Sequence, residues 1–352
     1  MLLSLVSNLD AGRFRSHIVL MRPGWLGDQL RAAGADPVIL PSRRGYDIGF
    51  IRRLCMQVHH SGADLIHAHL PDAAAYACLT GALTRTPVVA TYHGFPAAHG
   101  PSSRSTSLKL AVVRWLAARV VTVSSALRNE LVGRAHFSAA NTRTIHNGID
   151  WSVFDRPFDP DRLRRELGLD GRSPVVGMVA NLRPAKGYHF FVRAAARVAA
   201  AMPDVQFVAV GEPEEKLQRS LDQEIAGAGI ERQFRFLGTR DNVPEILRIL
   251  DVFVLSSLSE GMSIATVEAM GAGVPAVVTK SGGPEEIVTD KETGLLVPPG
   301  DDEALATGIL RCLTDRPMAC QMAEKGKADV RRRFALQTMV DQYAALYEEC
   351  LC

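Results

Sequence analysis

The chain has 352 residues, which is enough for two domains of ordinary size, and 47% hydrophobic with 22% charged residues is typical of soluble globular proteins. No apolar run approaches the roughly 18 residues of a membrane-spanning helix, and the first six residues are too short and lack the basic start of a signal peptide. Six cysteines without metal or redox spacing favour a reducing cytosol.

The net charge of +2 hides an asymmetry between the two halves of the chain. Residues 1–150 carry 16 Lys and Arg against 8 Asp and Glu, whereas the remainder carries 24 against 30. A basic first half favours an anionic partner, such as a membrane leaflet, an acidic saccharide or a phosphorylated lipid. The alternative is an arginine-rich surface without a particular partner, because the basic residues are spread along the sequence.

Short apolar strands alternate with helical stretches along the whole chain. The strands predicted in the first half cover residues 17–21, 37–40, 64–67, 88–92, 120–124 and 142–146. Those in the second half cover residues 175–180, 206–210, 234–237, 252–255 and 275–279. This alternation predicts an α/β protein with two doubly wound units, each built on a parallel sheet.

Turn residues separate the two series of strands. Residues 147–160 include Asn147-Gly148, Pro157 and Pro160, which predicts a hinge between a domain of residues 1–150 and one of residues 151–327. Residues 328–352 predict C-terminal helices whose apolar positions could pack on either domain, and we expect them to pack back toward the first.

Two glutamates eight residues apart, Glu260 and Glu268, mark the most informative segment. Residues 251–256 predict a buried strand, 259–262 a loop and 263–270 a helix. The unpaired amides of residues 262–265 at the start of this helix could bind a phosphate, and a carboxylate on each side could accept hydrogen bonds from sugar hydroxyls. The alternative is that one of these glutamates only interacts with the helix dipole and that the other is a solvated surface residue.

A second candidate phosphate site follows the predicted strand 175–180. The loop Asn181-Leu-Arg-Pro-Ala-Lys-Gly187 leads into a helix, so that Arg183 and Lys186 would both lie near a helix start. The alternative, two solvated surface cations, is weakened because both candidate sites would lie at carboxyl ends of strands in one sheet.

These motifs closely resemble those of retaining glycosyltransferases of family 4, over nearly the whole chain. The E-x7-E motif of that family matches Glu260 and Glu268, its basic loop matches residues 183–187, and Gly211 ends a strand where the family has a glycine beside the nucleotide. Other segments also resemble signatures of this family, namely residues 91–94, 123–124, 147–150, 236–238, 281–286 and 293–297.

The resemblance implies a GT-B fold, two facing Rossmann-like domains with a cleft between them, and a role for each matched residue. Glu268 would bind the ribose, Glu260 the transferred sugar, and Arg183 and Lys186 the departing diphosphate in place of a metal. His93 would touch the donor sugar. Remaining donor contacts are expected at Gly211, Gly238, Arg240, Gly261, Met262, Ser263 and Ile264.

The implied activity is transfer of a sugar from a nucleotide-diphosphate sugar to a saccharide or lipid-linked acceptor, in cell-envelope or exopolysaccharide synthesis. No carboxylate lies where a double displacement would need one, which favours a front-face path with retention. No cofactor, metal or nucleic acid is expected. The expected location is the cytoplasm, with a possible contact to the anionic inner membrane face. We expect His67 and His69 to lie on the same face of one strand rather than to form a metal-binding pair. Asp159-Pro-Asp161 is also not expected to bind a metal.

Two departures from the family pattern leave alternatives open. Asn181 stands where the family usually has arginine, so Arg183 would have to contact the diphosphate in its place. The chain also opens in what reads as the helix after the first central strand, so we expect that strand and its glycine-rich loop to be missing, with either an upstream start or a weakened enzyme. The alternatives are a nucleotide-sugar 2-epimerase and an inactive GT-B binding protein.

Overall fold

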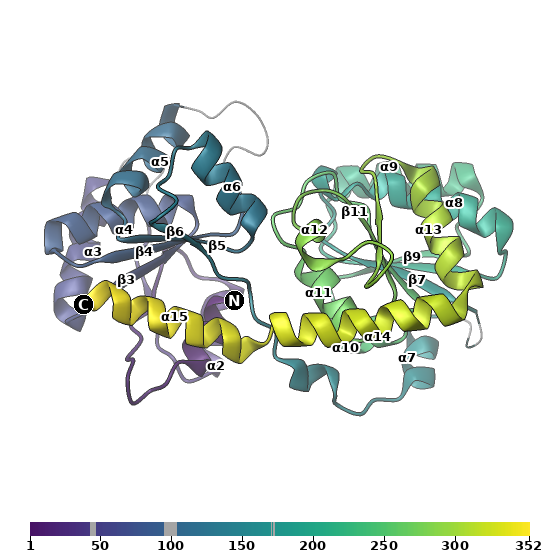
Figure 1. The fold of residues 1–352 in the computed structure, drawn as a ribbon, viewed down its shortest axis with the longest axis horizontal. Coiled ribbons are helices and arrows are strands. Elements are labelled where there is room, and N and C mark those ends of the chain that lie inside the picture. The colour runs from purple at the N-terminus through teal and green to yellow at the C-terminus, as the bar shows by residue number, and fades with distance from the viewer. Residues whose placement is uncertain (43–46, 95–103, 170, 172) are drawn as a thin grey trace. The chain divides into compact units, whose positions relative to one another are not determined.

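The computed structural model describes residues 1–42, 47–94, 104–169, 171 and 173–352 (Figure 1). The chain divides into two compact units, of which the first comprises Met1–Gly148 with Leu336–Cys352, and the second Ile149–Ala335. The sequence analysis placed these divisions after residues 150 and 327. No helix in the described ranges has the length and apolar character needed to cross a membrane.

The strands of the first unit form two parallel sheets. β1 (Val19–Leu20) pairs with β2 (Val38–Ile39), while the larger sheet has the order β3-β4-β5-β6. Its strands are β3 (Ile66–His69), β4 (Val88–Tyr92), β5 (Arg119–Thr122) and β6 (Thr142–Thr144). The helices are α1 (Leu2–Asn8), α2 (Trp25–Ala32), α3 (Ile48–Ser61), α4 (Pro71–Thr84), α5 (Arg104–Leu116), α6 (Ser125–Arg134) and α15 (Leu336–Leu351).

The register of β3 corrects one predicted boundary. Residues 64–67 were expected to form this strand, but Ile66 pairs with Val88 and His69 pairs with Thr91. Pairing with the fully buried β4 therefore carries the strand through His69, although a histidine-rich end gives a weak strand signal.

The C-terminal helix α15 supplies five of the nine buried residues in one core cluster of the first unit. Its apolar residues recur at helical spacing and pack against β4, β5 and α1. The cluster consists of Leu5, Val89, Val121, Ile145, Met339, Val340, Tyr343, Leu346 and Tyr347. Leu336–Cys352 belongs to the first unit, so this helix lies with strands that are far from it in the sequence.

The second unit is one six-stranded parallel sheet with the order β12-β11-β10-β7-β8-β9. Its strands are β7 (Val175–Val179), β8 (Gln206–Val210), β9 (Phe234–Gly238), β10 (Val252–Leu255), β11 (Ala276–Thr279) and β12 (Leu295–Val297). The α-helices are α7 (Pro160–Glu166), α8 (Tyr188–Ala201), α9 (Glu215–Ala228), α10 (Val243–Arg248), α11 (Ile264–Gly271), α12 (Pro284–Ile287), α13 (Asp302–Thr314) and α14 (Arg316–Arg333). Short 3₁₀ turns cover Trp151–Phe154 and Pro184–Lys186.

The strand order of the second unit contains a switch point. From β7 the chain builds outward through β8 and β9, then returns to the other side of β7 with β10. The order therefore reverses between β7 and β10, and ligands of open parallel sheets bind beyond the carboxyl ends of the strands at such a switch point. Helices α8, α9 and α13 cover one face of the sheet and α10, α11 and α14 the other (Figure 1).

Candidate functional site

The loop after β7 is fixed against the end of β10, across the switch point. Gly187 has a φ of 65°, and a side chain there would overlap the carbonyl oxygen of Ser256. The hydroxyl of Ser256 donates a hydrogen bond of 3.0 Å to the carbonyl of Lys186. Close packing that requires a glycine thus holds Lys186 beside the segment that follows β10.

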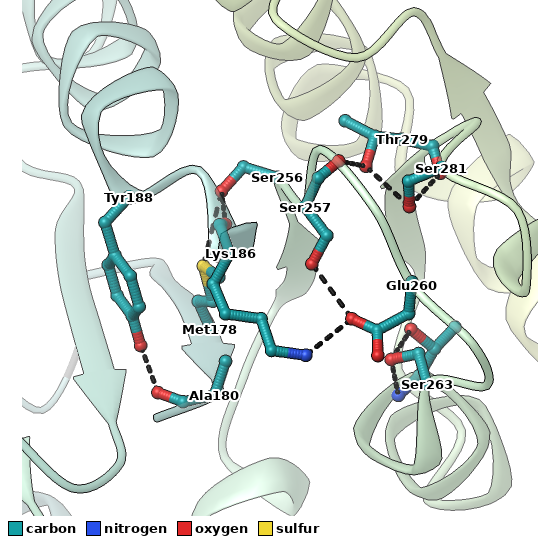
Figure 2. Close-up of polar contacts among 11 residues, drawn as sticks. Met178, Ala180, Lys186, Tyr188, Ser256, Ser257, Glu260, Ser263, Thr279 and Ser281 are labelled. Atoms are coloured by element: carbon teal, nitrogen blue, oxygen red, sulfur yellow. Dashed lines mark hydrogen bonds and ion pairs between the residues drawn. The ribbon is translucent and has the colours of Figure 1, made fainter. Parts of the chain in front are cut away.

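An ion pair bridges the two strand ends. Nζ of Lys186 lies 2.6 Å from Oε2 of Glu260, and Oγ of Ser257 donates to the same oxygen at 3.0 Å (Figure 2). The side chains of Lys186 and Glu260 are 26% and 11% exposed, so solvent screens this pair less than a surface pair. The structure thus brings together two residues that the sequence placed on separate motifs, and adds Ser257, which the sequence analysis did not single out.

The backbone of Glu260 is held by the loop after β11. The amide of Glu260 donates to Ser281, the amide of Gly283 donates back to Glu260, and both distances are 2.8 Å. A side chain at Gly283 would overlap the carbonyl of Gly261. Two consecutive glycines in the sequence were the signal for this close approach, and they fix the position of the carboxylate.

Helix α11 begins one residue later than predicted, at Ile264. Ser263 caps it by accepting hydrogen bonds from the amide of Thr266 at 3.2 Å and from its hydroxyl at 2.8 Å. Among the described residues, the amides of Ile264 and Ala265 have no hydrogen-bond acceptor. Free amides at the positive end of a helix dipole can bind an anion, and these two follow Gly261 and Met262 closely in the chain.

Glu268 lies inside α11 among small and apolar neighbours. Burial disfavours its charged form and raises its pKa from 4.5 to about 7. The residue is partly exposed, and its carboxyl group is not among the ion-pair or side-chain hydrogen-bond partners found in the described part of the chain. Its oxygens could therefore accept a hydrogen bond from a ligand hydroxyl.

The other predicted donor residues follow the next strands of the sheet. Arg183 pairs with Glu212 at 2.8 Å, near the end of β8, and does not join the Lys186–Glu260 pair. The amide of Gly211 donates to the carbonyl of Gly238 at 3.0 Å, and Nε of Arg240 donates to Leu237 at 3.0 Å. These residues line up along the carboxyl ends of β7, β8 and β9.

His93 belongs to the first unit, where it follows β4 directly. Burial lowers its pKa to about 4, so the ring is neutral at pH 7. His67 and His69 share a strand face, as predicted, with ring centroids 4.2 Å apart. In the described ranges, no group of three or more histidine, cysteine or acidic residues is arranged to hold a metal ion.

Both units match known sequence families, in chain order. Residues 1–153 match Glycosyltransferase Family 4, and residues 159–329 match Glycosyl transferases group 1. The chain belongs to glycosyltransferase family 4. The glutamate pair and the basic loop lie inside the second matched region, and the structure places both at the switch point of the second unit.

Two curated relatives illustrate the family. The chain is 32% identical to the lipopolysaccharide core biosynthesis mannosyltransferase LpsB of Rhizobium meliloti, over 62% of the chain and 63% of that relative, which is less than two thirds of its length. It is 30% identical to the UDP-Gal:alpha-D-GlcNAc-diphosphoundecaprenol alpha-1,3-galactosyltransferase of Escherichia coli, over 81% of the chain and 75% of that enzyme.

Solved structures share the fold. HepE of Anabaena, crystallised with UDP and glucose, is 25% identical and superimposes with a TM-score of 0.89 over 99% of this chain and 95% of HepE. A second crystal structure of HepE contains UDP-glucose. The two Rossmann-like units of this family 4 glycosyltransferase therefore form a GT-B fold.

Proposed function

We propose that this family 4 glycosyltransferase transfers a sugar from a nucleoside-diphosphate sugar to a saccharide or lipid-linked acceptor in cell-envelope or exopolysaccharide synthesis, with retention and without a metal. The observation that carries the proposal is the Lys186–Glu260 pair beside the start of α11. It places a cation, a carboxylate and free amides where one ligand could contact all three. The activities named for the two curated relatives, together with UDP and UDP-glucose in HepE, support this class of donor and acceptor.

In the proposed reaction the bond between the anomeric carbon and the diphosphate breaks, and the acceptor oxygen bonds to the same face of that carbon. The acceptor proton passes to the departing phosphate oxygen. Negative charge grows on the diphosphate, where Lys186 and the amides of Ile264 and Ala265 stabilise it. Lys186 supplies the positive charge that a divalent metal provides in other transferases.

Donor binding must rearrange the Lys186–Glu260 contact. Lys186 moves its interaction to a phosphate, and hydroxyls of the transferred sugar replace the ammonium group at Glu260. A nucleoside diphosphate without a sugar can compete for Lys186 but offers no hydroxyl to Glu260. The pair therefore favours the intact donor over the released nucleotide, while Glu268 accepts hydrogen bonds from the ribose in both.

A transfer assay with a panel of nucleotide sugars, saccharide acceptors and lipid-linked acceptors tests this function. We expect transfer in the presence of EDTA, and a product whose anomeric configuration by NMR is that of the donor. An isomerised donor would support an epimerase instead. Tight donor binding without transfer or hydrolysis across the panel would support a binding protein, and loss of transfer in EDTA would contradict metal independence.

The Glu260→Gln variant tests the exchange of partners at Lys186. We expect transfer to fall about tenfold or more, because the sugar hydroxyls lose a charged hydrogen-bond acceptor. Affinity for UDP should stay equal or rise, because Lys186 is released from its ion pair. Isothermal titration with UDP, together with initial rates, measures both. A parallel loss of UDP affinity and transfer would contradict the assignment of Glu260 to the sugar.

We also propose that the first unit contacts an anionic membrane surface through α5, in the cytoplasm at the inner membrane face. Leu108, Trp115 and Leu116 follow helical spacing and are 49%, 77% and 42% exposed. The guanidinium of Arg114 lies 5.5 Å from the ring centroid of Trp115. Exposed apolar residues next to a cation, on the basic half of the chain, suit the interface of an anionic bilayer.

Replacing both Trp115 and Leu116 with serine should weaken binding to vesicles that contain phosphatidylglycerol. We expect a loss of about tenfold or more in co-sedimentation, because two interfacial side chains are removed. Trp25→Ser is the matched control: Trp25 is 70% exposed on α2, on the other side of the first unit (Figure 1), and should bind vesicles as the unmodified chain does. Equal binding by all three proteins, or no preference for anionic over zwitterionic vesicles, would contradict this surface.

A further inference from the structure

The first unit contains a row of three histidines, of which only His93 is predicted to contact the donor sugar. His67 and His69 lie on one face of β3, and His93 follows the neighbouring strand β4. Nδ1 of His69 lies 3.2 Å from Nε2 of His93, and the two rings stack with their centroids 5.5 Å apart. Among the residues that the structure describes, the ring of His93 is thus held by another imidazole rather than by a carboxylate or a backbone group.

Helix α15 holds the far end of the row. The hydroxyl of Tyr347 lies 2.7 Å from Nδ1 of His67, whose Nε2 lies 2.8 Å from Oγ1 of Thr91. Thr91 in turn lies 3.2 Å from the hydroxyl of Tyr343. Both nitrogens of His67 are therefore occupied, and its ring packs against that of His69. This fixed ring limits the orientations that His69 can adopt.

The hydrogen bonds of His69 and His93 favour one tautomer for each ring. Burial keeps both rings neutral, so each has one N–H and one bare nitrogen. Nε2 of His69 is buried and has no hydrogen-bond partner in the described ranges. A buried N–H without an acceptor is the rarer situation in proteins, so the proton of His69 belongs on Nδ1, where it is donated to Nε2 of His93. The remaining proton of His93 then lies on Nδ1.

We propose that His69 is a positioning residue that holds His93 in one orientation and as the Nδ1–H tautomer, so that His93 presents an N–H donor to an oxygen of the donor sugar. This rests on the proposed function together with the contact between His93 and the donor sugar that the sequence predicts. Nδ1 of His93 makes no hydrogen bond to the residues that the structure describes, which leaves its proton for a ligand. A neutral donor fixed before the ligand binds costs no reorganisation during the reaction.

The tautomer of His93 can be read without substrate from long-range ¹H–¹⁵N spectra of ¹⁵N-histidine-labelled protein, with His93→Gln assigning the signals. We expect an Nδ1–H pattern for His93 in the unmodified chain. In His69→Leu that pattern should change to Nε2–H or a mixture. In His69→Asn it should persist, because the asparagine amide can donate from nearly the same place as Nδ1. An Nε2–H pattern in the unmodified chain, or an unchanged spectrum in His69→Leu, would overturn the proposal.

Tyr347→Phe is the control for general disruption, because it removes a hydroxyl from the row without touching the His69–His93 contact. It should leave the His93 spectrum unchanged, and the same change as in His69→Leu would overturn the specific role of His69. With a donor that the panel identifies, kcat/KM should fall about tenfold in His69→Leu and recover in His69→Asn. If no donor is turned over, the proposed function fails while the spectra still decide the role of His69.

Discussion

Replacing Lys186 with alanine is expected to lower the rate of transfer by about 10²–10³-fold, the usual effect of removing one preorganised group that stabilises transition-state charge. Lys186 pairs at the switch point with Glu260, which shortly precedes the start of α11. Because the charge on the diphosphate grows as its bond to the sugar breaks, the loss should appear mainly in kcat. Rapid-quench measurement of a single turnover separates this chemical step from product release.

Two further variants define what the Lys186→Ala result means. Lys186→Arg keeps the charge but changes its geometry, so we expect an intermediate rate. Lys325→Ala removes an exposed lysine from α14 and should transfer sugar as the unmodified chain does. Single-turnover rates within about threefold of the unmodified chain for Lys186→Ala would exclude leaving-group stabilisation by this residue. Circular dichroism melting of each variant shows whether a slow variant is still folded.

Arg183 shows why a motif alone did not settle the basic loop. The sequence analysis assigned it to the diphosphate together with Lys186, because both precede one helix. In the structure Arg183 pairs with Glu212, which is 29 residues away in the chain and follows a different strand. A phosphate role for Arg183 stays a prediction, and it requires donor binding to break this exposed ion pair, which costs little.

Buried strands were predicted best, since their apolar runs are bounded by turn residues. The ranges 88–92 and 206–210 agree with β4 and β8 residue for residue. β12 was missed because it is a three-residue edge strand, and such a short run carries little periodic signal. β3 was shifted because its pairing with β4, rather than its own composition, determines where it ends.

The candidate site divides in the same way. Glu260, Glu268 and Lys186 could be found from local motifs, because the loops and helix starts that carry them have their own sequence signals. The direct Lys186–Glu260 contact spans 74 residues and the His67–Tyr347 contact spans 280, so both depend on sheet order and on the return of α15. A local sequence pattern cannot predict contacts between residues that are so far apart in the chain.

Glu268→Gln is expected to have two effects of opposite sign, and the first concerns stability. The pKa of Glu268 is raised from 4.5 to about 7 in the folded chain, so between these pH values the unfolded chain loses the proton while the folded chain retains it. Below pH 4.5 the group has no effect; as pH rises to about 7 the folded state loses about 3 kcal/mol, and the penalty persists above that. Glutamine carries no such penalty.

Thermal melts at two pH values measure this effect. At pH 8 we expect Glu268→Gln to melt several degrees above the unmodified chain, whereas near pH 4 the two should melt together. Glu231→Gln, which removes an exposed carboxylate from the same unit, should change neither value by more than about a degree. Equal melting temperatures of Glu268→Gln and the unmodified chain at pH 8 would show that burial does not strain this carboxyl group.

The second effect concerns the nucleotide. The ionised carboxylate is the better acceptor for ribose hydroxyls, so binding of UDP should favour loss of the proton from Glu268, and affinity should rise as pH increases through about 7. Glu268→Gln should bind UDP about ten- to a hundredfold more weakly at pH 8 and lose this pH dependence. Calorimetry in buffers of different ionisation enthalpy measures both affinity and proton release. A proton release that persists in Glu268→Gln would place the titrating group elsewhere. If both effects occur, the carboxyl group that destabilises the empty fold is the one that holds the ribose, and its burial is explained by binding rather than by folding.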